Sequence, residues 1–265
     1  MVEQNYEFWQ WFTMVYRSGV NSALILVKVK SIRNFAHQCY SKNIIMGRNK
    51  LERFKYNDEN PMVVQAGKPL YETIKGKWRE ELFQNDQELV LELACGRGEY
   101  TVGLAQAYPK RNFVGVDIKG ARIWKGIKFA TENGLKNVGF LRTYIQNIDQ
   151  FFAPKEVNEI WVIHPDPRPK DSDERRRLTH PRFLELYRNL LVDDGWFHFK
   201  TDNAGLFEYT LEVLQDWKIK DFEFTRDLYK DEKLLALHHG IKTRYELKFT
   251  AEGHKVHYLR FKFER

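Results

Sequence analysis

The stretch Leu89-Val-Leu-Glu-Leu-Ala-Cys-Gly-Arg-Gly98 decides the fold of this chain. Its apolar residues flank one carboxylate, Glu92, and the run ends in two glycines, Gly96 and Gly98. An amphipathic segment, residues 99–107, follows directly, so the pattern predicts a buried parallel strand, a tight turn and a helix. Ligands of open α/β sheets bind at the carboxyl ends of strands, and glycine lets the backbone approach a ligand closely. The alternative is an ordinary strand-to-helix turn that binds nothing.

The acidic residues around this turn indicate which ligand it binds. Glu99 falls in the first turn of the helix, where it would repel the pyrophosphate of a dinucleotide, and Thr101 replaces the third glycine of the pattern G-x-G-x-x-G. A ligand with a cationic end fits better, and S-adenosylmethionine carries a sulfonium and an α-amino group that Glu92 could face. A second strand, residues 112–116, ends at Asp117. We therefore predict S-adenosylmethionine as the cofactor, with Asp117 binding its ribose hydroxyls.

The composition excludes a disordered protein and a disulfide-rich or metal-cluster protein. The 265 residues suit one large domain or one domain with extensions, and 43% hydrophobic residues can bury a large core. The two cysteines, Cys39 and Cys95, supply neither a disulfide framework nor a metal cluster. We therefore expect a cytoplasmic protein with no metal, in which Cys95 is a packing residue.

The net charge of +7 is distributed unevenly. The first 50 residues hold seven Lys/Arg and two Asp/Glu, whereas the other 215 hold 36 and 34. The body is nearly neutral, so any surface for nucleic acid must be a local basic cluster. The densest cluster is Arg175-Arg-Arg177, which we predict contacts RNA phosphates. Because three acids precede it, a solvated charged loop is the alternative.

By composition the chain has three parts. Residues 1–45 combine an aromatic cluster with an apolar run, residues 20–29, that is too short to span a membrane and lacks the flanks of a signal peptide. We favour the interpretation that the natural chain begins at Met46; a structured accessory segment is the alternative. Residues 46–88 form a charged lead-in that packs on the core, and residues 89–265 form the main domain.

Strands and helices alternate through the main domain. We expect strands at residues 89–93, 112–116, 138–142, 159–163, 196–200, within 215–224 and at 257–263, and helices at 99–107, 121–133, 183–191, 206–217 and 243–252. Such alternation predicts an α/β fold with a doubly wound, mostly parallel, seven-stranded sheet. The last segment alternates polar and apolar residues, which is typical of an antiparallel, edge-side strand.

A rigid loop follows the fourth expected strand. His164-Pro-Asp-Pro-Arg-Pro-Lys170 holds three prolines in five residues, which fix φ and clamp Asp166 at the carboxyl end of a central strand. We predict that Asp166 is the catalytic carboxylate, held rigidly against a substrate base beside the methyl donor. A solvated acid in a turn is the alternative.

Two further acids follow later segments. Asp202 ends the fifth strand, where it could also cap the next helix, and Glu246 lies three residues after Thr243, which is the spacing of a capping box. Guanine presents N–H donors on one edge that only acceptors can recognise. We predict both carboxylates at the substrate base, and helix capping alone is the alternative for each.

Taken together, these segments resemble the bacterial tRNA (guanine-N7-)-methyltransferases from about Gly47 to Phe263. The matching parts are Glu92–Gly98, Gly115–Asp117, Pro165–Pro167 followed by Lys170 and Arg175–Arg177, Phe199–Asp202, and Thr243–Glu246. The first two are typical of class I methyltransferases in general, and the last three in this order are specific to the family. The resemblance implies a Rossmann-like fold and methyl transfer from S-adenosylmethionine to N7 of a variable-loop guanosine in tRNA.

The resemblance also implies roles for individual residues. Cofactor contacts fall on Glu92, Gly96, Gly98 and Asp117, catalysis on Asp166, and substrate contacts on Lys170, Asp202, Thr243, Arg244, Tyr245 and Glu246. Guanine N7 attacks with its own lone pair, so the catalytic acid would stabilise the positive charge that develops on the purine. The implied partner is tRNA, and the sequence leaves both a monomer and a homodimer open.

Three departures from the family pattern stand out. Arg168 occupies a position that is Trp in many members, and acids interrupt residues 171–174, where members are usually more basic. Tyr144 replaces an acid that contacts the adenine side of the cofactor. We keep Tyr144 as a cofactor contact, through stacking on or packing over adenine, and we expect an active enzyme.

Two other functions stay open at the level of sequence. Amino-group methyltransferases of the same fold also use a carboxylate–proline loop, but they favour an aromatic residue beside the prolines, where this chain has Arg168. A non-catalytic RNA-binding or scaffold subunit would not need Glu92, Asp117 and Asp166 together, and this chain retains all three.

Overall fold

The computed structural model describes residues 10–18, 21–29 and 49–265. The chain divides into two compact units, Met1–Glu52 and Arg53–Arg265. In the first unit, β1 (Gln10–Ser18) and β2 (Asn21–Val29) pair as an antiparallel hairpin. The start of the natural chain at Met46 stays a prediction. Much of residues 1–45, including Cys39, lies outside the described ranges. No helix in the described part of the chain is long and apolar enough to cross a membrane.

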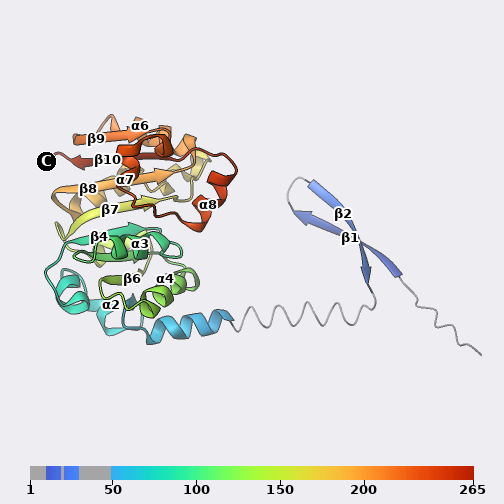
Figure 1. Ribbon diagram of the computed structural model, residues 1–265, viewed down its shortest axis with the longest axis horizontal. Helices are drawn as coiled ribbons and strands as arrows, with labels where there is room; N and C mark the ends of the chain where they lie inside the picture. The colour runs from blue at the N-terminus through green and yellow to red at the C-terminus, as the bar shows by residue number, and fades with distance from the viewer. Residues whose placement is uncertain (1–9, 19–20, 30–48) are drawn as a thin grey trace, which may run out of the picture. The chain divides into compact units, whose positions relative to one another are not determined.

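The second unit is built on an eight-stranded sheet with the strand order β3-β6-β5-β4-β7-β8-β10-β9 (Figure 1). The strands are β3 (Val63–Gln65), β4 (Leu89–Leu93), β5 (Asn112–Val116), β6 (Val138–Arg142), β7 (Val157–Ile163), β8 (Leu191–Thr201), β9 (Ile219–Thr225) and β10 (His257–Phe263). β10 runs antiparallel to both its neighbours, β8 and β9, and the other pairs are parallel. The predicted α/β class, with a mostly parallel sheet and one antiparallel edge-side strand, is confirmed.

The predicted number of seven strands is one too small. The additional strand, β3, lies beside β6 at the edge of the sheet and pairs with it in parallel over three residues. All three residues of β3 are buried. Three residues carry too little periodicity to separate a strand from a loop, so only the pairing with β6 identifies this segment as one.

Helices cover both faces of the sheet. The helices of the second unit are α2 (Pro69–Thr73), α3 (Glu99–Ala107), α4 (Gly120–Glu132), α5 (Pro181–Leu190), α6 (Ala204–Leu214), α7 (Glu232–Ala236) and α8 (Arg244–Ala251), together with a π-helical turn, Trp78–Phe83. Residues 49–59 are also helical. Buried side chains of α3, α4 and α7 form the core on one face. Buried side chains of α5, α6 and the π-helical turn form the core on the other. The sheet is therefore doubly wound, as predicted.

Strand β4 shows why the central strands read as continuous apolar runs. All five of its residues are buried. Leu89, Leu91 and Leu93 point into the core under α5 and α6, whereas Val90 points into the core under α3 and α4. Glu92 alternates onto the same face as Val90. A strand that is covered on both sides needs apolar residues at successive positions, so its lone carboxylate marks a special position.

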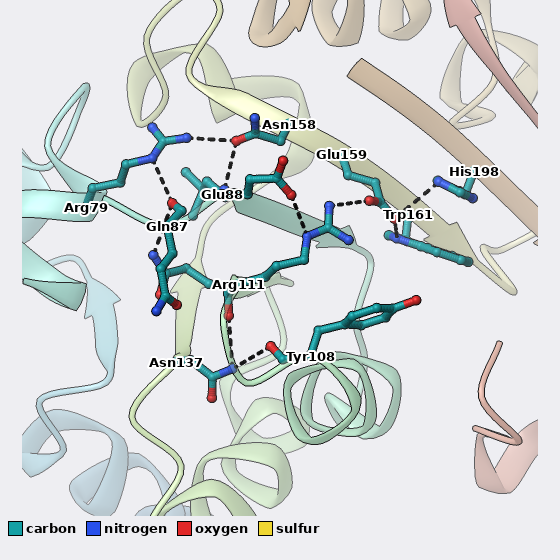
Figure 2. Close-up of polar contacts among 12 residues, drawn as sticks. Arg79, Gln87, Glu88, Tyr108, Arg111, Asn137, Asn158, Glu159, Trp161 and His198 are labelled. Atoms are coloured by element: carbon teal, nitrogen blue, oxygen red, sulfur yellow. Dashed lines mark hydrogen bonds and ion pairs between the residues drawn. The ribbon is translucent and has the colours of Figure 1, made fainter. Parts of the chain in front are cut away.

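Charge pairs close the amino ends of the strands. Figure 2 shows Arg111 between Glu88, 2.8 Å from its Nε, and Glu159 on β7. Glu159 also accepts a hydrogen bond from the indole N–H of Trp161 and lies 3.2 Å from Nε2 of His198. Burial alone would raise the pKa of Glu159, but His198 and Arg111 lower it to about 2. Charge pairing thus balances Glu159 and Arg111 at this end of the sheet.

Candidate active site

The glycine turn after β4 has the backbone geometry that its sequence predicts. Ala94, Gly96 and Gly98 have φ values of 59°, 56° and 67°, a left-handed conformation that favours glycine. A Cβ on Gly98 would lie 2.6 Å from the ring of Phe140 on β6, so a side chain is excluded there. A Cβ on Gly96 would meet nothing closer than 4.0 Å, so the space over this glycine is open.

A cavity of ≈ 460 Å³ opens at the carboxyl ends of the central strands. Its lining includes Ala94 after β4, Asp117 and Ile118 after β5, Thr143, Tyr144 and Ile145 after β6, and His164, Pro165 and Asp166 after β7. The strand order reverses between β4 and β7, and such a switch point is where open α/β sheets bind ligands. The predicted residues Asp117, Tyr144 and Asp166 therefore line one cavity, although Asp117 and Asp166 lie about 50 positions apart.

Asp117 is held between two turns. Its Oδ2 accepts a hydrogen bond from the backbone N–H of Gly96 at 3.0 Å, and its Oδ1 accepts one from the N–H of Lys119 at 2.8 Å. Each carboxylate oxygen retains acceptor capacity beyond one such bond. Ile118 and Ile145 add apolar walls beside it. A fixed carboxylate between apolar walls fits the ribose and adenine of a nucleoside cofactor.

Tyr144 lies at the rim of the cavity. The residue is 58% exposed, and it directly precedes a 3₁₀ helix, Ile145–Gln150. The exposed ring borders the same cavity as Asp117 and Ile118. The geometry is compatible with packing over a planar group, which is the role that the sequence predicts for it.

Glu92 lies behind the glycine turn rather than in the cavity wall. It is 4% exposed, and its Oε2 accepts hydrogen bonds from the backbone N–H of Thr101, at 2.7 Å, and from the Thr101 hydroxyl. Burial raises the pKa of Glu92 to about 8, although the bonds from Thr101 counteract it. Sequence reasoning noted Thr101 only as a missing glycine and missed that its hydroxyl binds this acid.

Asp166 projects from a strained loop. Its side chain is 76% exposed, and Oδ2 lies 3.5 Å from Nη2 of Arg168. The residues on either side of Pro165–Pro167, His164 and Arg168, both have left-handed φ values, 45° and 48°. Such conformations are costly for residues with a Cβ and persist only where the surroundings enforce them. The prolines and these two residues together place Asp166 at the cavity.

Asp202 does not cap α6, and this alternative was wrong. The cap is the next residue, Asn203, whose Oδ1 accepts a hydrogen bond from the N–H of Leu206 at 2.8 Å. Asp202 does not cap the helix because Asn203, in an extended conformation, occupies the cap position. It instead contacts Nδ1 of His164 at 3.1 Å and accepts a hydrogen bond from the hydroxyl of Tyr245 at 3.3 Å.

Glu246 forms only half of the predicted capping box. The Thr243 hydroxyl accepts a hydrogen bond from the N–H of Glu246 at 3.1 Å, as that motif requires. The Glu246 carboxylate, however, turns inward, where Oε1 contacts Nζ of Lys200 at 2.6 Å and accepts a hydrogen bond from Tyr229 at 2.5 Å. Its side chain is 0% exposed. In this conformation it therefore does not reach a substrate base, although the sequence predicted that contact.

Electrostatics hold Glu246 in its charged form. Burial alone would raise the pKa of Glu246, but His164 and Lys200 outweigh burial and lower it to about 2. Lys200, on β8, is 1% exposed, and sequence reasoning missed its role. The available signal was a lysine at the end of the strand segment Trp196-Phe-His-Phe-Lys200, in which three of the five residues are aromatic and apolar.

Three other predicted substrate residues, Lys170, Arg244 and Tyr245, are exposed. Lys170 is exposed and precedes a 3₁₀ helix, Asp171–Arg176. Arg244 and Tyr245 are exposed at the start of α8, which Figure 1 shows at the carboxyl end of β7 and β8. The backbone N–H of Arg244 donates to Glu99 at the start of α3, which ties the two helices together.

Basic side chains also line the cavity, and two of them, Arg168 and Arg176, lie in segments that the sequence analysis singled out. They are Lys119, Arg122, Arg168, Arg176 and Arg182. They come from the start of α4, the proline loop, the segment after it and α5. Their convergence makes this side of the cavity cationic, and only the fold shows it because the residues are far apart in the sequence.

Comparisons with known proteins agree with this geometry. A family model described as "Putative methyltransferase" matches residues 86–259. A tRNA (guanine-N(7)-)-methyltransferase of Cytophaga hutchinsonii is 49% identical over 220 residues, which cover 82% of this chain and 99% of that protein. A protein of the same name from Bacteroides fragilis is 44% identical, over 82% of this chain and 86% of that protein.

Solved structures support the fold independently. The 16S rRNA methyltransferase KamB superposes with a TM-score of 0.53 and 17% identity, over 70% of this chain and 92% of that one. An antibiotic-related methyltransferase gives 0.52 and 16%, with the same coverage. Identities this low show the shared fold alone. With the sequence identity to the curated relatives, the site and the fold lead to one conclusion: this chain belongs to the tRNA (guanine-N7-)-methyltransferase family.

Proposed function

We propose that this protein transfers a methyl group from S-adenosylmethionine to N7 of a guanosine in the variable loop of tRNA. The observation that carries the proposal is the convergence of Asp117, Asp166 and the His164–Asp202 pair at neighbouring strand ends. This arrangement would supply a nucleoside site, a carboxylate for the purine and a hydrogen-bond acceptor close together. Curated relatives named for this reaction, at up to 49% identity, supply the substrate class.

The residues of the cavity fit the cofactor. S-adenosylmethionine supplies an electrophilic methyl group on a sulfonium. Asp117 would accept hydrogen bonds from the ribose hydroxyls, and Tyr144 would pack over adenine. Glu92 lies behind the glycine turn, where its pKa of about 8 leaves it mostly protonated at neutral pH. A cation bound at the turn would favour its charged form.

Asp166 would stabilise the reaction electrostatically rather than by taking a proton. N7 of guanine attacks with its own lone pair, so positive charge develops on the purine ring. An acid whose position is fixed before the reaction stabilises that charge without reorganisation. Arg168 forms an ion pair with this acid, with 3.5 Å between its Nη2 and Oδ2 of Asp166.

Asp202 would recognise the base. Guanine offers N–H donors at N1 and N2, and Asp202, with a 17% exposed side chain, is an acceptor close to the loop of Asp166. Glu246 is buried and would act through Lys200 and His164 rather than by direct contact. Thr243, Arg244 and Tyr245 would extend the substrate surface along the start of α8.

The proposal is tested by mapping the methylated nucleoside. The protein is incubated with unmodified tRNA and labelled S-adenosylmethionine, and the product is digested and analysed by mass spectrometry. We expect N7-methylguanosine from the variable loop. Methyl on an exocyclic amine would replace our proposal with an amino-group methyltransferase, and no transfer to any tRNA would favour a non-catalytic RNA-binding subunit. Methylation of tRNA at guanine N7 would place the protein in the cytoplasm, with tRNA as its partner. The protein would act as a monomer or a homodimer.

The three consecutive arginines are expected to differ in their effect on tRNA binding. Arg175 and Arg176 are exposed, whereas Arg177 donates to the backbone oxygen of Arg168 at 3.1 Å and lies 4.3 Å over the ring of Tyr209. Replacing Arg175 and Arg176 with alanine should weaken binding of all tRNAs alike and lower the salt slope by about one unit per lost contact. Binding titrations at several salt concentrations measure this slope.

Arg177→Ala is the matched control. This substitution should lower the melting temperature, because it releases the proline loop. It should change the salt slope less than replacement of Arg175 or of Arg176 does. A loss of affinity confined to particular tRNA sequences would instead show that these arginines read bases.

A further inference from the structure

We propose that His164 is a positioning residue, which in its protonated form joins the catalytic loop to the substrate-side acid Asp202 and fixes that acid for recognition of the base. The inference rests on the proposed function, because it deepens the role assigned to Asp202. His164 directly precedes Pro165–Pro167 and lies two residues before Asp166. It comes from a different strand end than Asp202, so a bond between the two side chains fixes the loop relative to β8.

The bond is part of a charged cluster with alternating signs. Lys200 contacts Glu246 at 2.6 Å, Glu246 lies 3.5 Å from Nε2 of His164, and Nδ1 of His164 lies 3.1 Å from Asp202. The side chains of Lys200, Glu246 and His164 are 1%, 0% and 6% exposed, whereas that of Asp202 is 17% exposed. The cluster therefore runs from the buried interior to the one member that can meet a ligand.

The geometry favours an imidazolium. A neutral imidazole has one donor and one acceptor nitrogen, so one of its nitrogens would direct a lone pair at a carboxylate. In His164, Nδ1 forms a hydrogen bond with Asp202 at 3.1 Å, and Nε2 lies 3.5 Å from Oε2 of Glu246, within ion-pair distance. The protonated ring is the form that directs no lone pair at either carboxylate. The charges also balance, because the cations His164 and Lys200 face two anions.

The surrounding groups agree with this protonation state. Burial and Lys200 lower the pKa of His164. The contacts with the carboxylates of Asp202 and Glu246 raise this pKa and outweigh the two lowering effects, so the net shift is upward from 6.5. The other neighbours with titratable or charged groups are Tyr245 on α8, whose ring lies 5.7 Å from that of His164, Asp166 and Arg168 on its own loop, Tyr229, which donates to Glu246, and Lys242, which acts on Lys200. The carboxylates make the closest contacts.

The backbone of His164 also helps to position the loop that carries Asp166. Its N–H donates to the backbone oxygen of Lys200 at 2.8 Å, and its φ of 45° is unfavourable for a residue with a Cβ. The hydrogen bond with Asp202 and the ion-pair contact with Glu246 help hold this conformation, which directs the following prolines and Asp166 into the cavity. Loss of the proton would weaken the bond to one carboxylate and loosen the loop together with Asp202.

The sign of the pH dependence follows from the upward shift. The stabilisation by the charged ring is complete below the ordinary pKa of 6.5 and disappears as the pH rises through the higher pKa of the folded protein. Methyl transfer should therefore lose efficiency on the alkaline side of that value. Asp202 would be misplaced there, and a displacement of about 1 Å can cost roughly 100-fold in rate.

The test compares His164→Phe, which keeps a ring but has no donor, with His164→Asn, which keeps a donor near the position of Nδ1 and tolerates a left-handed backbone. We expect His164→Phe to lower kcat/KM for tRNA by about 10- to 100-fold, with S-adenosylmethionine affinity changed less than about twofold. His164→Asn should restore much of kcat/KM, and neither variant should show the alkaline loss of the wild type. His254→Asn, an exposed histidine after α8, is the matched control and should retain the wild-type profile.

A second measurement needs no activity and decides the case if His164→Phe fails to fold. NMR titration of the wild-type imidazole should give a pKa above 6.5 for His164, and Asp202→Asn should lower it. A His164 pKa below 6.5, or an unchanged alkaline limb in His164→Asn, would overturn the proposal. Failure of the wild type to methylate tRNA would overturn the proposed function, whereas the titration would still report on the His164–Asp202 pair.

Discussion

Replacing Asp166 with alanine is expected to lower the rate of methyl transfer to tRNA by roughly 10²- to 10³-fold, the usual loss when one preorganised electrostatic group is removed. The carboxylate lies on the strained proline loop, lines the cavity and is 76% exposed, so its removal disturbs little packing. Asp166→Asn should lose nearly as much, because the negative charge rather than the shape of the side chain stabilises the cationic purine. Cofactor affinity should change little, because Asp117 belongs to another strand end.

The measurement is single-turnover transfer of labelled methyl to unmodified tRNA, with cofactor affinity determined separately. Asp171→Ala is the matched control, because Asp171 is an exposed acid that follows the same loop. It should keep nearly full activity. Equal transfer rates for Asp166→Ala and the wild type would remove Asp166 from the mechanism.

Glu246→Gln is expected to destabilise the folded protein by about 3–5 kcal/mol, the usual cost of removing one partner from a buried ion pair. Lys200 and Glu246 are 1% and 0% exposed, so the lysine would keep its charge without water or a carboxylate to compensate it. Replacing both partners with methionine should recover much of the loss, because apolar side chains of similar size leave no buried charge unpaired. This double variant should still have low activity, since His164 loses a partner.

Urea unfolding measures these free energies. The exposed helix pair Lys128–Glu132 provides the control, and Glu132→Gln should cost about 0.5 kcal/mol or less. Glu246 has a folded-state pKa of about 2, below its ordinary 4.5, so its contribution is present above 4.5 and is lost as the pH falls toward 2. The stabilities of wild type and Glu246→Gln should therefore converge in acid. A constant difference across that range would assign the loss to packing instead of charge.

Much of the fold could be predicted because its signals are local. The apolar run at Leu89–Leu93 and the alternation at His257–Phe263 became β4 and β10. Boundaries were less certain: β8 begins at Leu191, five residues before the predicted start at Trp196, because pairing with β7 extends it. The three-residue strand β3 has no signal of its own, since its partner β6 lies about 75 residues away.

The residue types of the site could be predicted, but not all of their partners. Asp202 was identified from its place after a strand, and the structure adds the contact with His164 that the sequence does not indicate. Asn203 rather than Asp202 caps α6, a difference of one residue that no spacing rule resolves. Glu246 had the spacing of a capping box, yet its carboxylate turned toward Lys200, because a buried cation attracts it more strongly than a backbone N–H.

By itself the sequence determined the α/β class, the glycine turn and the proline loop, because strand periodicity, glycine and proline act through the local backbone. It also identified the chemical class of the site, since Glu92, Asp117 and Asp166 each follow or occupy a predicted strand. Only the tertiary structure decided which of these acids face the cavity and which are buried. Burial and charge pairing depend on residues brought together from distant segments, and they determine whether a carboxylate meets a ligand or, like Glu246, holds another side chain in place.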